Sequence, residues 1–272
     1  MSKKARPTQP GSRESGLDAR LQLLRNDHSS PSLTLAHEAI DLAEDWLKAG
    51  SHPKRLAREL LSMHPGLAVI VNVARLLEEE DPDVVRSLDR LRESLREGKA
   101  CIAARLTEQV PPHPTVITLS NSSTVCEALF HLQAHGVYLV ESRPVNESLQ
   151  MAERLRDRLV LAGEGAAVHL IEANTIGNVV PQVDCAIVGV DTISRSGAVL
   201  HKVGTLPLAL CCRHFRKPFY AIGHSLKQID HDFDELPSGN GVLETQIFDI
   251  TPRDLITQII TERNTGSGDL PA

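Results

Sequence analysis

The spacing of hydrophobic residues divides the chain into two parts. Up to about residue 110, apolar residues recur every three or four positions, as they do in 33–47, 67–77 and 82–109, which is the period of amphipathic helices. A proline-rich stretch at 111–114 interrupts this pattern, because proline ends helices. After it, short apolar runs alternate with helical segments. We therefore predict a helical domain at 15–110 and a second domain at 115–263, with a disordered tail at 1–14 and a flexible tail at 264–272.

The second part has the alternation of strands and helices that is typical of an α/β fold. Its predicted strands are apolar along their whole length, which indicates a parallel sheet that is buried on both faces. The pattern predicts a Rossmann-like parallel sheet covered by helices on both faces. A further amphipathic segment is predicted at 254–261. The predicted strands are 115–119, 137–140, 168–171, 185–190 and 219–222, and the predicted helices are 123–135, 147–159 and 206–215.

Composition excludes several classes of function. The 272 residues contain 29 Lys and Arg against 35 Asp and Glu, and only 3% are aromatic, so we expect neither a nucleic-acid surface nor base-stacking platforms. The five cysteines form no CxxC pair, so we expect reduced thiols and no metal site. Since the chain has no apolar run of membrane-spanning length and no secretory signal, we predict a cytoplasmic protein without a membrane partner.

Polar side chains follow the predicted strands at the edge where open α/β sheets bind ligands. After the first strand, the sequence Ser-Asn-Ser-Ser-Thr at 120–124 precedes a helix, where hydroxyl, amide and backbone N–H groups bind an anion or simply cap the helix. After the second strand, Glu141 and Arg143 provide a carboxylate and a guanidinium, which suit a phosphate group or a surface ion pair.

Three more charged residues lie near the ends of the later strands. Asp191 follows an apolar strand, so burial favours an acid/base role, although turns also use aspartate there. Lys202 stands between apolar residues before a Gly-Thr helix start, which suits anion binding or a structural turn, and Lys227 adds a cation. Together these groups predict a phosphate-bearing small ligand. The chain has no GxGxxG or Walker A sequence, so dinucleotide and P-loop sites are excluded.

The order of five segments resembles one known superfamily. It holds the α, β and δ regulatory subunits of eukaryotic initiation factor 2B and the isomerases of methylthioribose 1-phosphate and ribose 1,5-bisphosphate. The resemblance covers most of 17–263 and implies a helical domain on a Rossmann-like domain, in a homodimer or larger assembly. The segments are VYLVESRP (137–144), VDCAIVGVD (183–191), HKVGTLPLAL (201–210), KPFYAIG (217–223) and FDITPRDLI (248–256).

The resemblance also implies roles for individual residues. In the isomerases, a Cys after the first strand and an Asp after the fourth carry the chemistry. The Asp corresponds to Asp191, whereas Ser120 stands in place of the Cys, and a serine hydroxyl is a much weaker acid than a thiol. Lys202 and Lys227 correspond to the family's lysines, and His201 replaces an Asn.

Two phosphate-binding motifs of the isomerases are missing from the sequence. The Arg-Gly loop should fall near 27–31, where the chain has Asp-His-Ser-Ser-Pro. An Arg-Pro-Thr motif is replaced by His-Pro-Gly at 64–66. These departures, with the loss of the Cys, leave two hypotheses open.

The first hypothesis is an aldose–ketose isomerase of a pentose 1-phosphate. Asp191 would be the acid/base that opens the furanose ring and moves a proton between neighbouring carbons, with Ser120 as the second catalytic residue. The alternative is a non-catalytic regulatory protein, related to initiation factor 2B, that senses a sugar phosphate or a nucleotide. Neither needs a cofactor. In both, the predicted helix at 206–215 is a candidate contact for a homo-oligomer, and a helix buried in the core explains its apolar sequence equally well. The predicted ligand-binding residues are Asn121, Ser122, Ser123, Arg143, His201, Lys202 and Lys227.

Overall fold

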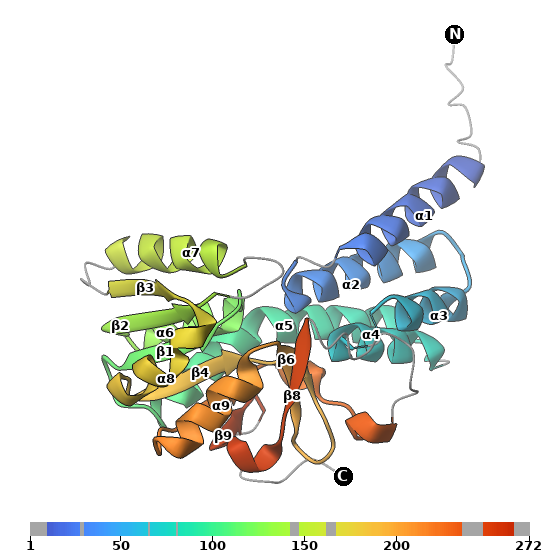
Figure 1. Ribbon diagram of the computed structural model, residues 1–272. Helices are drawn as coiled ribbons and strands as arrows, with labels where there is room; N and C mark the ends of the chain where they lie inside the picture. The colour runs from blue at the N-terminus through green and yellow to red at the C-terminus, as the bar shows by residue number, and fades with distance from the viewer. Residues whose placement is uncertain are drawn as a thin grey trace.

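The computed structural model describes residues 10–27, 30–64, 66–79, 81–141, 147–161, 167–235 and 247–263. Helices of the N-terminal part lie beside an α/β part, and the long helix α5 runs between them (Figure 1). None of the helices in the described ranges combines the length and the hydropathy that a membrane span requires. The helices of the first part are α1 (Pro10–Asn26), α2 (Ser32–Lys48), α3 (Pro53–Met63), α4 (Ala68–Glu78) and α5 (Val84–Thr107).

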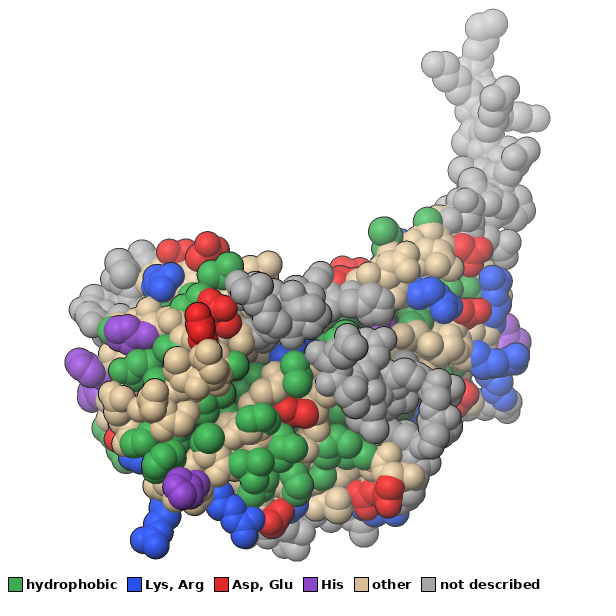
Figure 2. Space-filling view, viewed as in Figure 1, with side chains coloured by type: hydrophobic (Ala, Val, Ile, Leu, Met, Phe, Trp, Pro, Cys, Tyr) green, Lys and Arg blue, Asp and Glu red, His purple; other side chains and the backbone are tan. Residues whose placement is uncertain are grey.

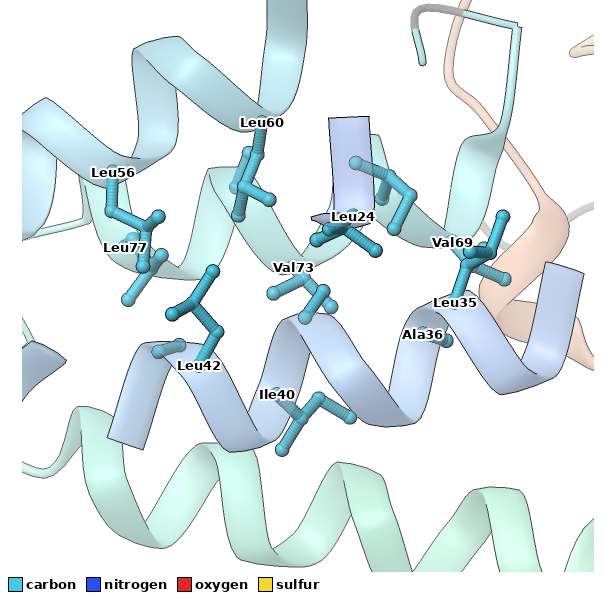
Figure 3. Packing of buried hydrophobic residues seen from close by; sticks show 14 of the residues in the cluster. Leu24, Leu35, Ala36, Ile40, Leu42, Leu56, Leu60, Val69, Val73 and Leu77 are labelled. Carbon is cyan, nitrogen blue, oxygen red and sulfur yellow. The ribbon is translucent and has the colours of Figure 1, made fainter. Parts of the chain in front are cut away.

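The N-terminal helices enclose one hydrophobic core. Apolar side chains of α2, α3 and α4 point toward one another between the helices, and α1 adds Leu24 (Figure 3). Trp46 is almost fully buried here, and its indole N–H donates to the carbonyl of His52 at 3.2 Å, so its one polar atom is satisfied. Helix α1 begins at Pro10, within the stretch predicted to be disordered, whereas 1–9 and 264–272 lie outside the described residues.

The predicted parallel sheet is confirmed. In the described ranges its strands follow the order β3-β2-β1-β4-β7-β9, and every neighbouring pair is parallel. Five of these strands match the predicted runs, and β9 adds one at the edge, within the segment predicted only as amphipathic. The strands are β1 (Thr115–Leu119), β2 (Gly136–Val140), β3 (Ala167–Ile171), β4 (Cys185–Gly189), β7 (Phe219–Ile222) and β9 (Gln258–Ile260).

Helices cover both faces of this sheet, as predicted. Along β1 the side chains alternate, so that Val116 packs with α5, α6 and α7 while Ile117 packs with α8 and α9. Both faces of the strand are therefore buried, which explains its uninterrupted apolar sequence. The helices are α6 (Ser123–His131), α7 (Glu147–Leu161), α8 (Ile176–Val179) and α9 (Thr205–His214), with short 3-10 turns at Ala173–Thr175, Val180–Gln182, Ser225–Lys227, Phe233–Glu235 and Arg253–Leu255.

A small antiparallel sheet, which the hydrophobic pattern does not predict, lies beside the main one. It has the order β5-β6-β8, formed by β5 (Thr192–Ile193), β6 (Val199–Lys202) and β8 (Phe248–Thr251). The strands are two to four residues long, too short to show a period. This sheet carries His201 and Lys202 at the end of β6.

The helical and α/β parts meet along α5. Gly98 lies on this helix, and a Cβ atom there would come within 2.6 Å of the His224 ring. That ring is held in place, because Leu226 donates its backbone N–H to Nδ1 at 3.0 Å and Ser94 Oγ lies 3.1 Å from Nε2. Glycine at 98 therefore permits the close approach of the two parts.

We predict that Gly98→Ala destabilises the protein. The clash with a fixed ring costs about 1–3 kcal/mol, which exceeds the gain of about 1 kcal/mol from replacing a helical glycine with alanine. The free energy of unfolding, measured with urea, should fall. Gly177→Ala is the matched control, because a Cβ atom there meets nothing within 4 Å. Equal stabilities of the two variants would contradict the prediction.

Candidate functional site

The candidate site lies where the strand order of the main sheet reverses. Strands β1 and β4 are neighbours, and the chain leaves them toward opposite edges of the sheet, which is the place where open α/β folds bind ligands. A cavity of about 150 Å³ opens at their carboxyl ends, and residues of the helical part close it from the other side. The predicted residues that line it are Ser120, Asn121, Ser122, Ser123, Asp191, His201, Lys202 and Lys227. Arg143 lies outside the described residues.

Ser120 directly follows β1 and has an unusual backbone conformation. Its φ is +66°, in the left-handed region that non-glycine residues rarely adopt, and the residue is buried. Its Oγ donates to Glu147 Oε2 at 2.9 Å. The next turn of chain begins α6, and Ser122 caps that helix by accepting from the backbone N–H of Val125 at 3.3 Å. Ser122 thus lines the cavity and also fills the capping role.

Glu147 joins Ser120 to Lys202. The Lys202 Nζ lies 2.8 Å from Glu147 Oε1, and only 8% and 11% of these two side chains are exposed. The ring of Phe248 packs near the ammonium, with its centroid 5.5 Å away. Glu147 is held by the first turn of α7, where the neighbouring Ser148 donates to the carbonyl of Val140 at 2.7 Å. A buried carboxylate therefore holds the lysine predicted to bind phosphate.

Lys227 approaches Asp191 from the 3-10 turn that follows β7. Its Nζ donates to Ser32 Oγ at 2.8 Å and to the carbonyl of Val190 at 2.5 Å. Burial lowers the pKa of Lys227, and the nearby Asp191 carboxylate opposes that effect. Asp191 is fixed through its backbone N–H, which donates to Leu200 at 2.9 Å. A carboxylate and a buried cation thus meet at the cavity.

His201 is a neutral imidazole in this site. Thr205 Oγ1 donates to the carbonyl of Lys202 at 2.6 Å, so it accepts at 3.0 Å from His201 Nδ1, and the proton is on that nitrogen. The other nitrogen, Nε2, would lie 3.3 Å from a Cβ atom at Gly189, and that Cβ atom would also come within 2.8 Å of Ser122 Oγ, so glycine at the end of β4 makes room for both side chains. Burial lowers the pKa of His201 to about 4.

The depressed pKa of His201 predicts a loss of stability in acid. Unfolding exposes a histidine with a pKa near 6.5, so the unfolded chain binds the extra proton between about pH 6.5 and pH 4, and stability falls as the pH drops through that window. The contribution is about 3 kcal/mol. We expect the free energy of unfolding of His201→Gln to fall less between pH 7 and pH 4 than that of the exposed control His214→Gln. Parallel curves would contradict this.

Asn121 provides an acceptor that the described part of the protein leaves unused. Its Nδ2 donates to Gln150 Oε1 at 3.2 Å, while its buried Oδ1 has no hydrogen-bond partner among the described residues. Buried polar atoms are normally paired, so an unpaired oxygen beside a cavity suits a ligand hydroxyl. Within the same described ranges, no three His, Cys, Asp or Glu side chains are grouped as metal ligands.

One predicted anion site is occupied by the protein itself. The Gly-Thr start of α9 is capped by the carboxylate of Asp249, which accepts from the backbone N–H of Gly204 at 2.7 Å and of Leu206 at 3.2 Å. Gly204 has φ +106°, which only glycine adopts easily. The alternative of a structural turn therefore holds at this helix start, and Lys202 faces the cavity through its side chain.

Sequence reasoning missed Glu147 and the contribution of the helical part. Glu147 follows the second strand at the same sheet edge, so the rule that selected Glu141 could also have selected it. The helical part adds residues from the two stretches where the isomerases' phosphate motifs are missing. From these stretches the cavity lining includes Asp27, Ser30, Pro31, His64 and Gly66.

The chain matches a family model over residues 52–265, which is more than half of its length. That model describes the initiation factor 2 subunit family. The chain belongs to this family. The family includes pentose-phosphate isomerases as well as initiation factor 2B-like proteins.

Two members of the family illustrate this range. A translation initiation factor eIF-2B subunit 2-like protein of Pyrococcus furiosus is 30% identical over 221 residues, covering 76% of this chain and 78% of that protein. The ribose 1,5-bisphosphate isomerase of Archaeoglobus fulgidus is 31% identical over 169 residues, covering 54% of this chain and 52% of the isomerase. The chain is thus similar in sequence both to initiation factor 2B-like proteins and to pentose-phosphate isomerases.

Solved structures of the family share the fold. The translation initiation factor eIF-2B of Pyrococcus horikoshii has a TM-score of 0.78 at 25% identity, covering 92% of this chain and 96% of that one. The 5-methylthioribose 1-phosphate isomerase of the same organism has a TM-score of 0.63 at 19% identity, covering 91% and 83%. Family structures also form oligomeric complexes, such as a tetrameric eIF2B-beta2-delta2 complex from C. thermophilum.

Proposed function

We propose that the protein is an aldose–ketose isomerase that acts on a pentose 1-phosphate of the ribose 1,5-bisphosphate or methylthioribose 1-phosphate type. The observation that carries the proposal is the convergence of Asp191, Lys202, Lys227 and Ser120 on one cavity at the switch point of the sheet. These groups come from four separate segments of the sequence. Catalysis of proton transfer next to a phosphate needs such a set of an acid/base group and cations.

In the proposed mechanism each group has a distinct role. Asp191 opens the furanose ring and moves a proton between neighbouring carbons. Lys202 and Lys227, together with Ser122, Ser123 and Arg143 (the last outside the described residues), bind phosphate and hydroxyl groups. The Asn121 oxygen, which has no hydrogen-bond partner in the described ranges, accepts from a sugar hydroxyl. His201, neutral at pH 7, offers a nitrogen acceptor and adds no charge. Positioning of the substrate provides the rest of the acceleration.

A second function is favoured by two features of the same cavity. Ser120 lacks the acidity of the isomerases' thiol, and Glu147 already neutralises Lys202. Both features suit a regulatory protein, related to initiation factor 2B, that senses a sugar phosphate or a nucleotide without converting it. The eIF-2B-like relatives are consistent with that alternative.

One experiment separates the two functions. The purified protein is incubated with ribose 1,5-bisphosphate, methylthioribose 1-phosphate or ribose 1-phosphate and followed by phosphorus and carbon NMR. The isomerase function predicts a new ketose phosphate from one of the three. Binding without conversion would favour the regulatory function and reject the isomerase.

We also propose that the protein is a cytoplasmic homo-oligomer, a dimer or larger. Hydrophobic side chains gather on the face of the α/β part where α9 lies (Figure 2). On α9 and just after it, Leu210 and Phe215 are 52% and 38% exposed, so this face offers two large apolar side chains to a partner. Light scattering at micromolar concentration should give at least twice the 29.7 kDa chain mass. A monomer mass would reject the proposal.

A further inference from the structure

A chain of paired polar groups lines the cavity, and the roles given to Asp191 and the lysines leave it unexplained. Ser120 Oγ donates to Glu147 Oε2 at 2.9 Å, and Lys202 Nζ lies 2.8 Å from Glu147 Oε1. Each carboxylate oxygen of Glu147 therefore has one fixed partner. The hydrogen bond from Ser120 places Glu147 Oε2 where it can receive the hydroxyl proton.

The backbone fixes Ser120, which lines the cavity beside Glu147. Ser120 has φ +66°, a conformation that is strained for any residue with a side chain. It lies between the end of β1 and the start of α6, and it lines the cavity. Because its proton points to Glu147, the lone pairs of its Oγ remain available to accept a proton. Among the described residues, no group donates a hydrogen bond to that oxygen.

The reaction requires a second proton acceptor. When the enol intermediate becomes a ketose phosphate, one carbon gains a proton while the hydroxyl of its neighbour loses one. The two protons move at neighbouring atoms, the carbon and the hydroxyl oxygen. With Asp191 giving its proton to the carbon, a second group beside the hydroxyl would take the other proton.

We propose that Glu147, acting through Ser120, is that second acceptor, so that the two residues form a proton relay in place of a thiol. This inference rests on the isomerase function proposed above. Glu147 is a positioning residue by this account, because it acts on the substrate only through the Ser120 hydroxyl. Lys202 holds its carboxylate in the geometry that receives the serine proton.

The proton balance of the relay closes over one turnover. As the enol becomes the ketone, its O–H bond breaks and that electron pair forms the carbonyl, while the carbon–carbon π pair takes a proton from neutral Asp191. The hydroxyl proton passes to Ser120 Oγ, and the Ser120 proton passes to Glu147. In the next ring opening, Asp191 removes the carbon-bound proton and that C–H electron pair becomes the enol double bond. The ring C–O bond breaks with its electron pair on the ring oxygen, which takes back the proton from Glu147 through Ser120.

The need for Glu147 depends on the residue at position 120. A thiol ionises with a pKa of about 8.5, so it exchanges protons without help, whereas a hydroxyl needs a hydrogen-bonded base. A cysteine at this position should therefore make the carboxylate dispensable. A purely structural role for Glu147 would not depend on whether an oxygen or a sulfur occupies the position.

The test is a double-mutant cycle in which the full chain converts the substrate found by NMR. We expect Glu147→Gln to lower kcat about 100-fold or more with little change in KM, which is the size of a general acid–base contribution. In the Ser120→Cys background, the same change should lower kcat less than about tenfold. Glu153→Gln, at an exposed position of the same helix, is the control and should change neither value. An equal loss of kcat in both backgrounds would overturn the relay.

A second variant guards against misfolding of Glu147→Gln. Ser120→Ala leaves the ion pair of Glu147 with Lys202 intact, and it should lower kcat as much as Glu147→Gln does, with no further loss when the two are combined. Unchanged kcat in Ser120→Ala would overturn the relay and leave the isomerase function standing. If the unmodified protein converts none of the three sugar phosphates, the isomerase function and the relay both fail.

Discussion

Asp191→Asn should lose turnover by a factor of about 10²–10⁴ while keeping most of its affinity for the sugar phosphate. The amide has nearly the shape of the carboxylate but neither gives nor takes a proton at neutral pH. Ring opening then lacks its acid/base group, whereas Lys202 and Lys227 still bind the phosphate. Phosphorus NMR measures turnover, and thermal stabilisation by the sugar phosphate reports binding.

The control for this prediction is Asp157→Asn, which removes an exposed carboxylate from α7 and should change neither quantity. Full activity of Asp191→Asn would remove Asp191 from the mechanism. If the protein is a regulatory relative instead, the same substitution changes affinity at most, because there is no turnover to lose.

Lys202→Met should strongly destabilise the protein as well as weaken phosphate binding. Removal of the ammonium leaves Glu147 as an uncompensated buried charge, which typically costs about 3–5 kcal/mol of unfolding free energy. By contrast Lys48, whose side chain is 66% exposed, pairs with Glu44 and Asp45 at the surface, and Lys48→Met should cost less than about 1 kcal/mol. Denaturant unfolding of the two variants measures this contrast.

A double variant separates two effects of Lys202→Met: the loss of the lysine from the binding site, and the destabilisation caused by the unpaired Glu147 carboxylate. Lys202→Met combined with Glu147→Leu removes both charges, and it should recover most of the stability lost in Lys202→Met. It should not recover phosphate binding, because a buried charge-assisted hydrogen bond of about 1.5–3 kcal/mol is still missing. Undiminished thermal stabilisation of Lys202→Met by sugar phosphates would take Lys202 out of the binding site.

Sequence patterns predicted the main sheet because its strands are buried on both faces. A strand such as Cys185–Gly189 needs apolar residues at every position, so it can be recognised in the sequence as an uninterrupted apolar segment. The small sheet left no such signal, because Thr192–Ile193 has only two residues and depends on its partners. Position along the sheet edge likewise led to Asp191 and Lys227, which follow recognisable strands.

Other features of the site depend on contacts between distant residues. The left-handed backbone of Ser120 is not encoded by serine, which usually avoids it, and results from the surrounding packing. The link from Glu147 to Lys202 joins residues 55 positions apart, and no local spacing predicts it. Asp249, which caps α9, is also far along the sequence from the helix start at Gly204 that it caps. The sequence alone therefore could not distinguish this helix start from an anion site.

Helix α5 makes the proline-rich stretch a poor place to divide the protein. Leu88 and Leu95 of this helix belong to the core of the N-terminal helices, whereas Ile102 and Leu106 belong to the core against the main sheet. A fragment that starts after the prolines would expose the apolar surface of α6 that α5 covers, and it would aggregate more readily than the whole chain. We therefore expect the two parts to unfold together, because α5 contributes to the hydrophobic core of each.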